Sequence, residues 1–137
     1  MMTTSCYPVL MSQDIQKGAA FFMQVFGFQE TFTSDWYISL KNDDDFELAL
    51  IDSQHDTIPD QYKAVSQGII LNFEVDNVDQ LYTEIVTKQK APILMELQDE
   101  DYGQRHFLIE SPDKLLIDVI QVIPPSDDYL EKYVETE

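Results

Sequence analysis

A single carboxylate is the strongest chemical signal in the sequence. Asp118 stands in the middle of an otherwise apolar stretch, LLIDVIQV at residues 115–122. A charged side chain in such a strand is costly unless it faces water, a cation or a ligand. The sequence therefore points first to Asp118 as a residue with a function.

The other reactive side chains give weaker signals. We expect His55 to be exposed in a linker, and His106 to be an ordinary surface or packing residue rather than a base. No G-x-S-x-G or cysteine-centred motif is present, so the sequence predicts no catalytic triad. Cys6 is the one cysteine, which excludes an intramolecular disulfide, and we expect it to be a small buried side chain.

Asp118 is expected on the second strand of a hairpin. Residues 105–110 and 115–122 are rich in β-branched and large apolar side chains. The sequence SPDK at 111–114 supplies the turn, because proline fixes φ and the flanking serine and aspartate can bond the local backbone. This hairpin closes a longer series of elements.

The order strand, helix, strand, strand, strand is predicted twice. Asp14 is the N-cap of the first helix and Gly27 ends it, whereas Asn77 is the N-cap of the second, which closes near Lys90. Aligning Asp14 with Asn77 also superposes the preceding strands, which indicates a tandem repeat. The predicted strands are 7–12, 29–34, 36–41, 46–52, 68–75, 92–97, 105–110 and 115–122, with an acidic loop at 98–103.

The length and composition predict one globular domain, with 137 residues and 44% hydrophobic side chains. Module one covers about 5–53, a linker about 54–67, module two about 68–123, and an acidic tail 124–137. The tail carries an apolar stripe at helical spacing. The stripe consists of Tyr129, Leu130 and either Tyr133 or Val134.

Three stretches resemble the vicinal oxygen chelate superfamily, which includes glyoxalase I, extradiol dioxygenases and bleomycin-resistance proteins. PVLMSQDIQKGAAFFMQVFGF is similar to the opening of its first module, ILNFEVDNVDQL to the start of its second, and YGQRHFLIESPDKLLIDVIQ to its closing hairpin. The resemblance covers about residues 7–122. It implies an α+β fold of two tandem βαβββ modules, whose eight strands form a curled sheet around a groove with the helices outside. The turn departs from the family pattern, with Ser111 in place of Asp and Lys114-Leu115 in place of Gly-Asn.

The resemblance also implies which positions would bind a metal. Metal-using members ligate from four strand positions, which correspond here to Tyr7, Glu47, Ile70 and Asp118. Ile70 has no donor atom, and the Tyr7 phenol is protonated at neutral pH. Glu47 and Asp118 with waters are weak candidates for Mg²⁺ or Mn²⁺, and a poor set for zinc, nickel or iron. We therefore expect no cofactor, with a divalent metal as the weaker possibility.

The groove implied by the resemblance would be mostly apolar with a few polar groups, as small-molecule sites are. Strand parity assigns to it Tyr7, Val9, Met11, Glu47, Ala49, Ile51, Ile70, Asn72, Glu74, Leu116, Asp118 and Ile120. Its carboxylates favour a planar or cationic guest, on which Trp36 or Tyr37 could stack. The expected ligand contacts are Tyr7, Trp36, Glu47, Asn72 and Asp118, with no catalytic residue. The alternatives are that Trp36 packs in its strand and that both carboxylates are simply solvated.

Charge and hydropathy exclude some partners. The sequence has 26 acidic and 8 basic residues, a net charge of −18, which argues against nucleic acid and anionic membrane. The charge favours a cation or a cationic ligand, or serves solubility alone. No apolar run reaches spanning length, no signal peptide is evident, and one cysteine fits a reducing compartment, so we expect a cytoplasmic protein. The resemblance implies a homodimer.

Three hypotheses follow for the function. The first is a metal-independent binding protein of the bleomycin-resistance type, which sequesters a small, partly aromatic or cationic molecule. The second is an isomerase, lyase or hydrolase-like enzyme that uses a divalent metal at a reduced site of Glu47 and Asp118. The third is a structural or partner-binding module that acts through the acidic tail.

Overall fold

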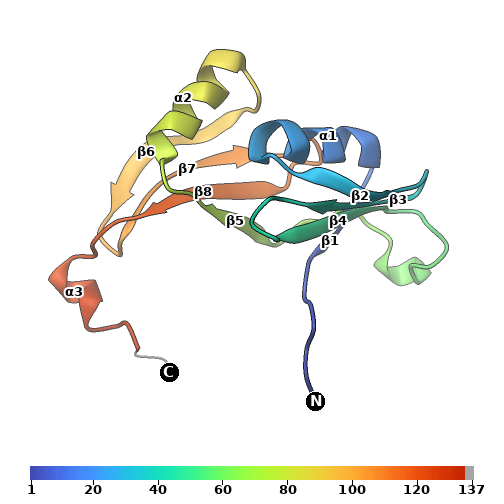
Figure 1. The fold of residues 1–137 in the computed structure, drawn as a ribbon, viewed down its shortest axis with the longest axis horizontal. Helices are drawn as coiled ribbons and strands as arrows, with labels where there is room; N and C mark the ends of the chain where they lie inside the picture. The colour runs from blue at the N-terminus through green and yellow to red at the C-terminus, as the bar shows by residue number, and fades with distance from the viewer. Residues whose placement is uncertain (135–137) are drawn as a thin grey trace. The chain divides into compact units, whose positions relative to one another are not determined.

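The computed structural model describes residues 1–134, which form two compact units (Figure 1). Unit 1 contains Met1–Gly68 and Ser111–Lys114, and unit 2 contains Ile69–Glu110 and the chain from Leu115 onward. Each unit repeats the order strand, helix, strand, strand, strand. The predicted α+β class with two tandem βαβββ modules is therefore confirmed. The part of the predicted tail at 135–137 lies outside the described residues.

Unit 1 builds its module on a four-stranded sheet, sheet A, in the order β1-β4-β3-β2. Strands β1 and β4 are parallel, and the other neighbours are antiparallel. Helix α1 contacts β3 and β4 and buries Ala19, Phe22 and Val25. The elements are β1 (Val9–Ser12), α1 (Ile15–Phe26), β2 (Gln29–Thr33), β3 (Tyr37–Lys41), β4 (Glu47–Asp52) and the short 3-10 helix η1 (Asp60–Tyr62).

All three predicted helix caps are present. Asp14 accepts a hydrogen bond from the backbone N–H of Lys17, and Gly27 has φ of 73° beyond the last turn of α1. Asn77 accepts from the backbone N–H of Gln80 at the start of the helix in unit 2. The side chains of Asp14 and Asn77 satisfy backbone N–H groups of the first turn, which have no partner within the helix. For this reason such residues mark helix starts in a sequence.

Unit 2 has the same design on sheet B, in the order β5-β8-β7-β6. Strands β5 and β8 are parallel, and β8, β7 and β6 form an antiparallel series. The elements are β5 (Ile70–Glu74), α2 (Val78–Lys88), β6 (Ile93–Glu100), β7 (Gln104–Glu110), β8 (Leu116–Val122) and α3 (Asp127–Leu130).

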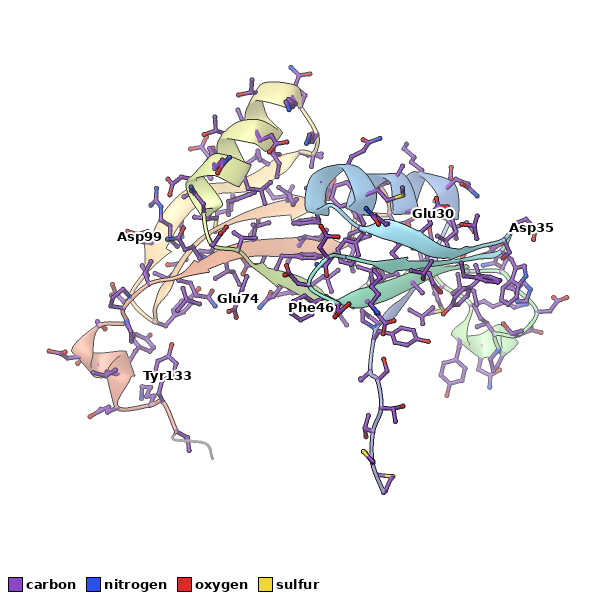
Figure 2. All side chains as sticks on the ribbon, viewed as in Figure 1. Glu30, Asp35, Phe46, Glu74, Asp99 and Tyr133 are labelled. Atoms are coloured by element: carbon purple, nitrogen blue, oxygen red, sulfur yellow. The ribbon has the colours of Figure 1, made fainter. Side chains whose placement is uncertain are left out.

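Helix α2 covers one face of sheet B (Figure 1). Tyr82 of α2 meets Phe107 of β7 edge to face, with 5.1 Å between ring centroids, and Phe107 and Ile117 are fully buried. Since neighbouring side chains in a strand alternate, the residues next to these point to the opposite side, which we call the far face of sheet B. It carries Asn72, Glu74, Gln98, Glu100, His106, Asp118 and Ile120. Figure 2 shows Glu74 on this side, away from α2.

Three details differ from the sequence predictions. β6 continues through Glu100, where the sequence predicts a loop at 98–103, because an edge strand tolerates charged and polar side chains. Phe46 precedes β4 and is exposed, so this strand begins one residue later than the predicted 46–52. Cys6 is exposed, so its predicted burial is wrong: β1 begins at Val9, and Cys6 lies outside the sheet.

The SPDK turn is anchored within unit 1. The Ser12 hydroxyl donates to Asp113 Oδ2 at 2.5 Å, and the backbone N–H of Gln13 donates to Asp113 Oδ1 at 3.0 Å. Ser12 is fully buried, and its Oγ also accepts from the backbone N–H of Asp14 at 3.1 Å. The carboxylate of Asp113 therefore holds the turn against the start of α1.

The same turn places Lys114 at φ of 64°, a left-handed conformation that a side chain disfavours. We predict that Lys114→Gly raises the free energy of unfolding by about 1 kcal/mol, since relief of this strain exceeds the added entropy of the unfolded chain. Urea denaturation measures the change. Lys63→Gly is the control, because Lys63 has φ of −68° and gains nothing from glycine. Equal destabilisation by both substitutions would contradict the prediction.

No helix in residues 1–134 combines the length and apolar character needed to cross a membrane.

Candidate functional site

The far face of sheet B carries a hydrogen-bonded group of three titratable side chains. His106 Nδ1 lies 2.7 Å from Asp118 Oδ1, and His106 Nε2 lies 2.8 Å from Glu100 Oε2. The side chain of His106 is 6% exposed, against 14% for Asp118 and 26% for Glu100. The ring is thus enclosed, whereas both carboxylates reach the surface. We call Glu100, His106 and Asp118 the imidazole bridge.

Both ring nitrogens of His106 act as donors. A carboxylate only accepts hydrogen bonds, and a neutral imidazole has a single N–H, so it could satisfy only one of the two partners. The imidazolium form satisfies both. The geometry therefore assigns a positive charge to His106, between two negative charges.

The titration behaviour follows from these contacts. Burial by itself lowers the pKa of His106, but the hydrogen bonds to Glu100 and Asp118 outweigh it, so the pKa is raised above the ordinary value for histidine. The hydrogen bond from His106, followed by that from Gln98, lowers the pKa of the Glu100 carboxyl. Gln98 Nε2 donates to Glu100 Oε2 at 2.8 Å. His106 and Glu100 therefore each favour the charged form of the other.

Sheet register places a further polar side chain next to the bridge. Asn72 of β5 is paired with Asp118 of β8, and because both point to the far face, their side chains are neighbours. Asn72 is exposed, as is Ile70 on the same strand. A fixed carboxylate thus lies beside an amide and exposed apolar surface.

An aromatic side chain from the β6–β7 turn flanks the bridge. The Tyr102 ring meets the His106 ring at 6.4 Å and 74°, and Tyr129 of α3 meets Tyr102 at 6.1 Å. The Tyr133 hydroxyl donates to the Tyr102 carbonyl at 2.8 Å, so the segment after β8 holds this turn. Burial, and then the negative charge of Glu100, raises the pKa of Tyr102.

The structure brings Asn72 and Asp118 together in unit 2. Tyr7, Trp36 and Glu47, the other three expected ligand contacts, belong to unit 1. Tyr7 is exposed before β1, and Glu47 at the start of β4 accepts from the Ser5 hydroxyl at 2.9 Å.

Trp36 is half-buried and stacks on another ring. The imidazole of His55 lies parallel to it, with 3.8 Å between ring centroids and 10° between planes. His55 is also half-buried, so the expectation of a simply exposed linker histidine is wrong. One face of the indole is already covered by a ring of the same chain.

Sequence reasoning missed Glu100 and His106. His106 was expected to be an ordinary surface or packing residue, and the structure instead makes it the centre of the bridge. No sequence signal was available for His106, because the predicted four-residue turn at 111–114 would pair Glu110 with Leu115 and so place His106 and Asp118 on opposite faces. The structure pairs Glu110 with Leu116, one residue further on, which puts both side chains on the same face. The sequence also offers no signal for Glu100, which lies in a predicted loop.

The donor atoms of the bridge do not fit a metal ion. His106 directs one nitrogen to each carboxylate, so the three groups converge on no common point. Across residues 1–134, no group of three or more His, Cys, Asp or Glu side chains is arranged to hold a metal. Ile70, which occupies one of the four strand positions that ligate metal in the resembling superfamily, has no atom that can coordinate a metal ion.

The bridge is built to accept hydrogen bonds. His106 places one ring nitrogen within hydrogen-bond distance of each carboxylate, and these contacts fix the orientation of both acceptor groups. Two carboxylates and one imidazolium leave a net charge of about −1 on the cluster. The chemistry that this arrangement supports is recognition of a donor group.

Comparisons with known proteins agree with the fold. The sequence model of the glyoxalase-like domain family matches residues 5–123 of this chain. No curated protein sequence matches the chain.

Several solved structures share the fold at low sequence identity. A glyoxalase/bleomycin resistance protein/dioxygenase family enzyme from Burkholderia phytofirmans PsJN is 21% identical, with a TM-score of 0.72 over 85% of this chain and 97% of its own. A lactoylglutathione lyase from Agrobacterium tumefaciens is 21% identical, with a TM-score of 0.69 over 87% and 94%. A virulence protein from Salmonella typhimurium is 18% identical, with a TM-score of 0.72 over 90% and 99%.

Proposed function

The chain belongs to the glyoxalase-like domain family, and from this premise we propose that it is a small-molecule-binding protein. It sequesters a partly aromatic or cationic molecule without a metal, in the manner of the bleomycin-resistance type. Asp118 and Asn72 receive the donor group of this ligand on the far face of sheet B. Tyr7, Trp36 and Glu47 of unit 1 are further proposed contacts.

One observation carries the proposal: His106 Nδ1 lies 2.7 Å from Asp118 Oδ1 and holds this carboxylate in place. The carboxylate is 14% exposed, which leaves it within reach of a ligand but not freely solvated. An acceptor that is already oriented loses little conformational freedom on binding. The exposed apolar side chain of Ile70 nearby supplies surface for the rest of the ligand.

Titration of the ¹⁵N-labelled protein with small aromatic alcohols, amides and amines, in the presence of a chelator, tests the proposal. We expect saturable shifts of the amide resonances of Asn72, His106 and Asp118. Asp118→Asn should weaken binding about tenfold, since a hydrogen bond to a charged acceptor is replaced by one to a neutral acceptor.

Glu74→Gln is the matched control, because Glu74 lies on the same face and takes no part in the bridge. It should leave the affinity unchanged. Binding that occurs only after Mg²⁺, Mn²⁺ or Zn²⁺ is added would contradict the metal-independent proposal and favour the metalloenzyme.

We also propose, from the family resemblance, that the chain forms a homodimer. Light scattering coupled to size-exclusion chromatography measures its mass in solution, and a monomer at all concentrations would contradict this.

A further inference from the structure

The positive charge of His106 lies next to the acceptor that the proposed function assigns to the ligand. Its Nδ1 is 2.7 Å from Asp118 Oδ1. In residues 1–134, Asp118 Oδ2 has no hydrogen-bond partner in the protein, so this oxygen is available to a ligand. For a group bound to this oxygen, the imidazolium of His106 is the nearest charge after the carboxylate itself.

No other cation on β7 contributes to this charge balance. Arg105, the neighbour of His106, points to the α2 side of sheet B, where it pairs with Asp79 and Asp99 at 2.8 and 2.9 Å. The groups that face His106 are Glu100 and Gln98 from β6, Asp118 from β8, Tyr102 from the β6–β7 turn, and Glu74 farther off on β5. Among these groups, His106 is therefore the one that supplies positive charge.

The charge of His106 has different effects on two kinds of ligand. A cationic donor at Asp118 Oδ2 is attracted by the carboxylate and repelled by the imidazolium close behind it. A neutral hydroxyl or amide donor keeps its hydrogen bond and meets little repulsion. The imidazolium of His106 therefore reduces the difference in affinity between a cationic ligand and a neutral ligand of the same shape.

We propose that His106 is the specificity-determining residue of the Asp118 site, and that it adapts the site to neutral hydroxyl or amide donors. The proposal rests on the proposed function, and it names the ligand group within the broader class. Without the imidazolium, the same carboxylate would select ammonium or amidinium groups.

The test compares two probes of nearly the same shape, benzyl alcohol and benzylamine. Their affinities are measured by NMR titration for the wild type and for His106→Gln, which keeps a donor but has no charge. We expect the preference for benzylamine to rise about tenfold in the variant, because one repulsive unit charge is removed at a few ångströms. Gln98→Ala is the control, since it removes a hydrogen bond to Glu100 and no charge.

A second measurement needs no variant. In the wild type, raising the pH until His106 loses its proton should shift the preference toward benzylamine in the same direction, while the amine stays protonated. This pH titration of the wild type tests the role of His106 even if the His106→Gln variant does not fold.

The outcomes separate the two proposals. If both probes shift Asn72 and Asp118 but their preference changes neither in His106→Gln nor with pH, the role of His106 is wrong and the proposed function stands. If neither probe binds, the proposed ligand class and the role of His106 are both overturned.

Discussion

His106→Leu is expected to lower the free energy of unfolding by about 3 kcal/mol, because it leaves the carboxylate of Asp118 largely buried without its cationic partner. Leucine fills much of the space of the imidazole, so the loss reports the charge and hydrogen bonds rather than a cavity. Urea denaturation at pH 6 measures the change. The control is His55→Leu, which removes a half-buried ring stacked on Trp36 but breaks no hydrogen bond between an imidazole and a carboxylate.

The difference between the wild type and His106→Leu should depend on pH. The pKa of His106 is raised in the folded protein, so its contribution is complete below the unfolded pKa of about 6.5 and is lost as the pH rises through the folded pKa. The pKa of Glu100 is lowered, so its contribution is lost as the pH falls through that folded value. The stabilisation should therefore be largest in mildly acidic solution. A difference that grows steadily toward alkaline pH would contradict the bridge.

Asp113→Ala is expected to lower the free energy of unfolding by about 2 kcal/mol, because it removes two hydrogen bonds to a charged acceptor and leaves the buried Ser12 hydroxyl without this partner. Ser12→Ala alone should cost less. In the double variant the two effects should not add, since both remove the same contact.

Asp60→Ala is the control for this second prediction. Asp60 is also an aspartate of unit 1, but it is 96% exposed and forms only a surface ion pair with Lys63. Such pairs contribute little, so the variant should match the wild type. Full additivity of Ser12→Ala and Asp113→Ala would mean that the turn is not held by this contact.

The fold could be predicted from the sequence because its signals are local. Helix caps at Asp14 and Asn77, the glycine that ends α1 and the turn at 111–114 each follow from the chemistry of a few neighbouring residues. Their repetition in the same order predicted two modules. Asp118 could be singled out for the same reason, since a carboxylate within an apolar strand is anomalous without reference to any other element.

The partners of Asp118 depend on strand pairing, which is not local. β6 pairs with β7 through two register irregularities, one between Ile93 and Met95 and one between Met95 and Gln98. These register shifts place Glu100 beside His106, and the residue pattern of the two strands does not predict them. The polar run that looked like a loop is an edge strand. The stack of His55 on Trp36 likewise depends on how a linker without periodicity folds back.

The most direct test of the account is the protonation of the His106 ring in the folded wild-type protein. Long-range ¹H–¹⁵N NMR spectra at pH 7, before and after addition of one equivalent of Zn²⁺, distinguish protonated, bare and metal-bound ring nitrogens. The account predicts that both nitrogens of His106 carry protons, and that zinc leaves them unchanged while Asp118→Asn alters them. A bare nitrogen at pH 7, or one that binds zinc, would contradict the imidazolium bridge and the metal-independent site built on it.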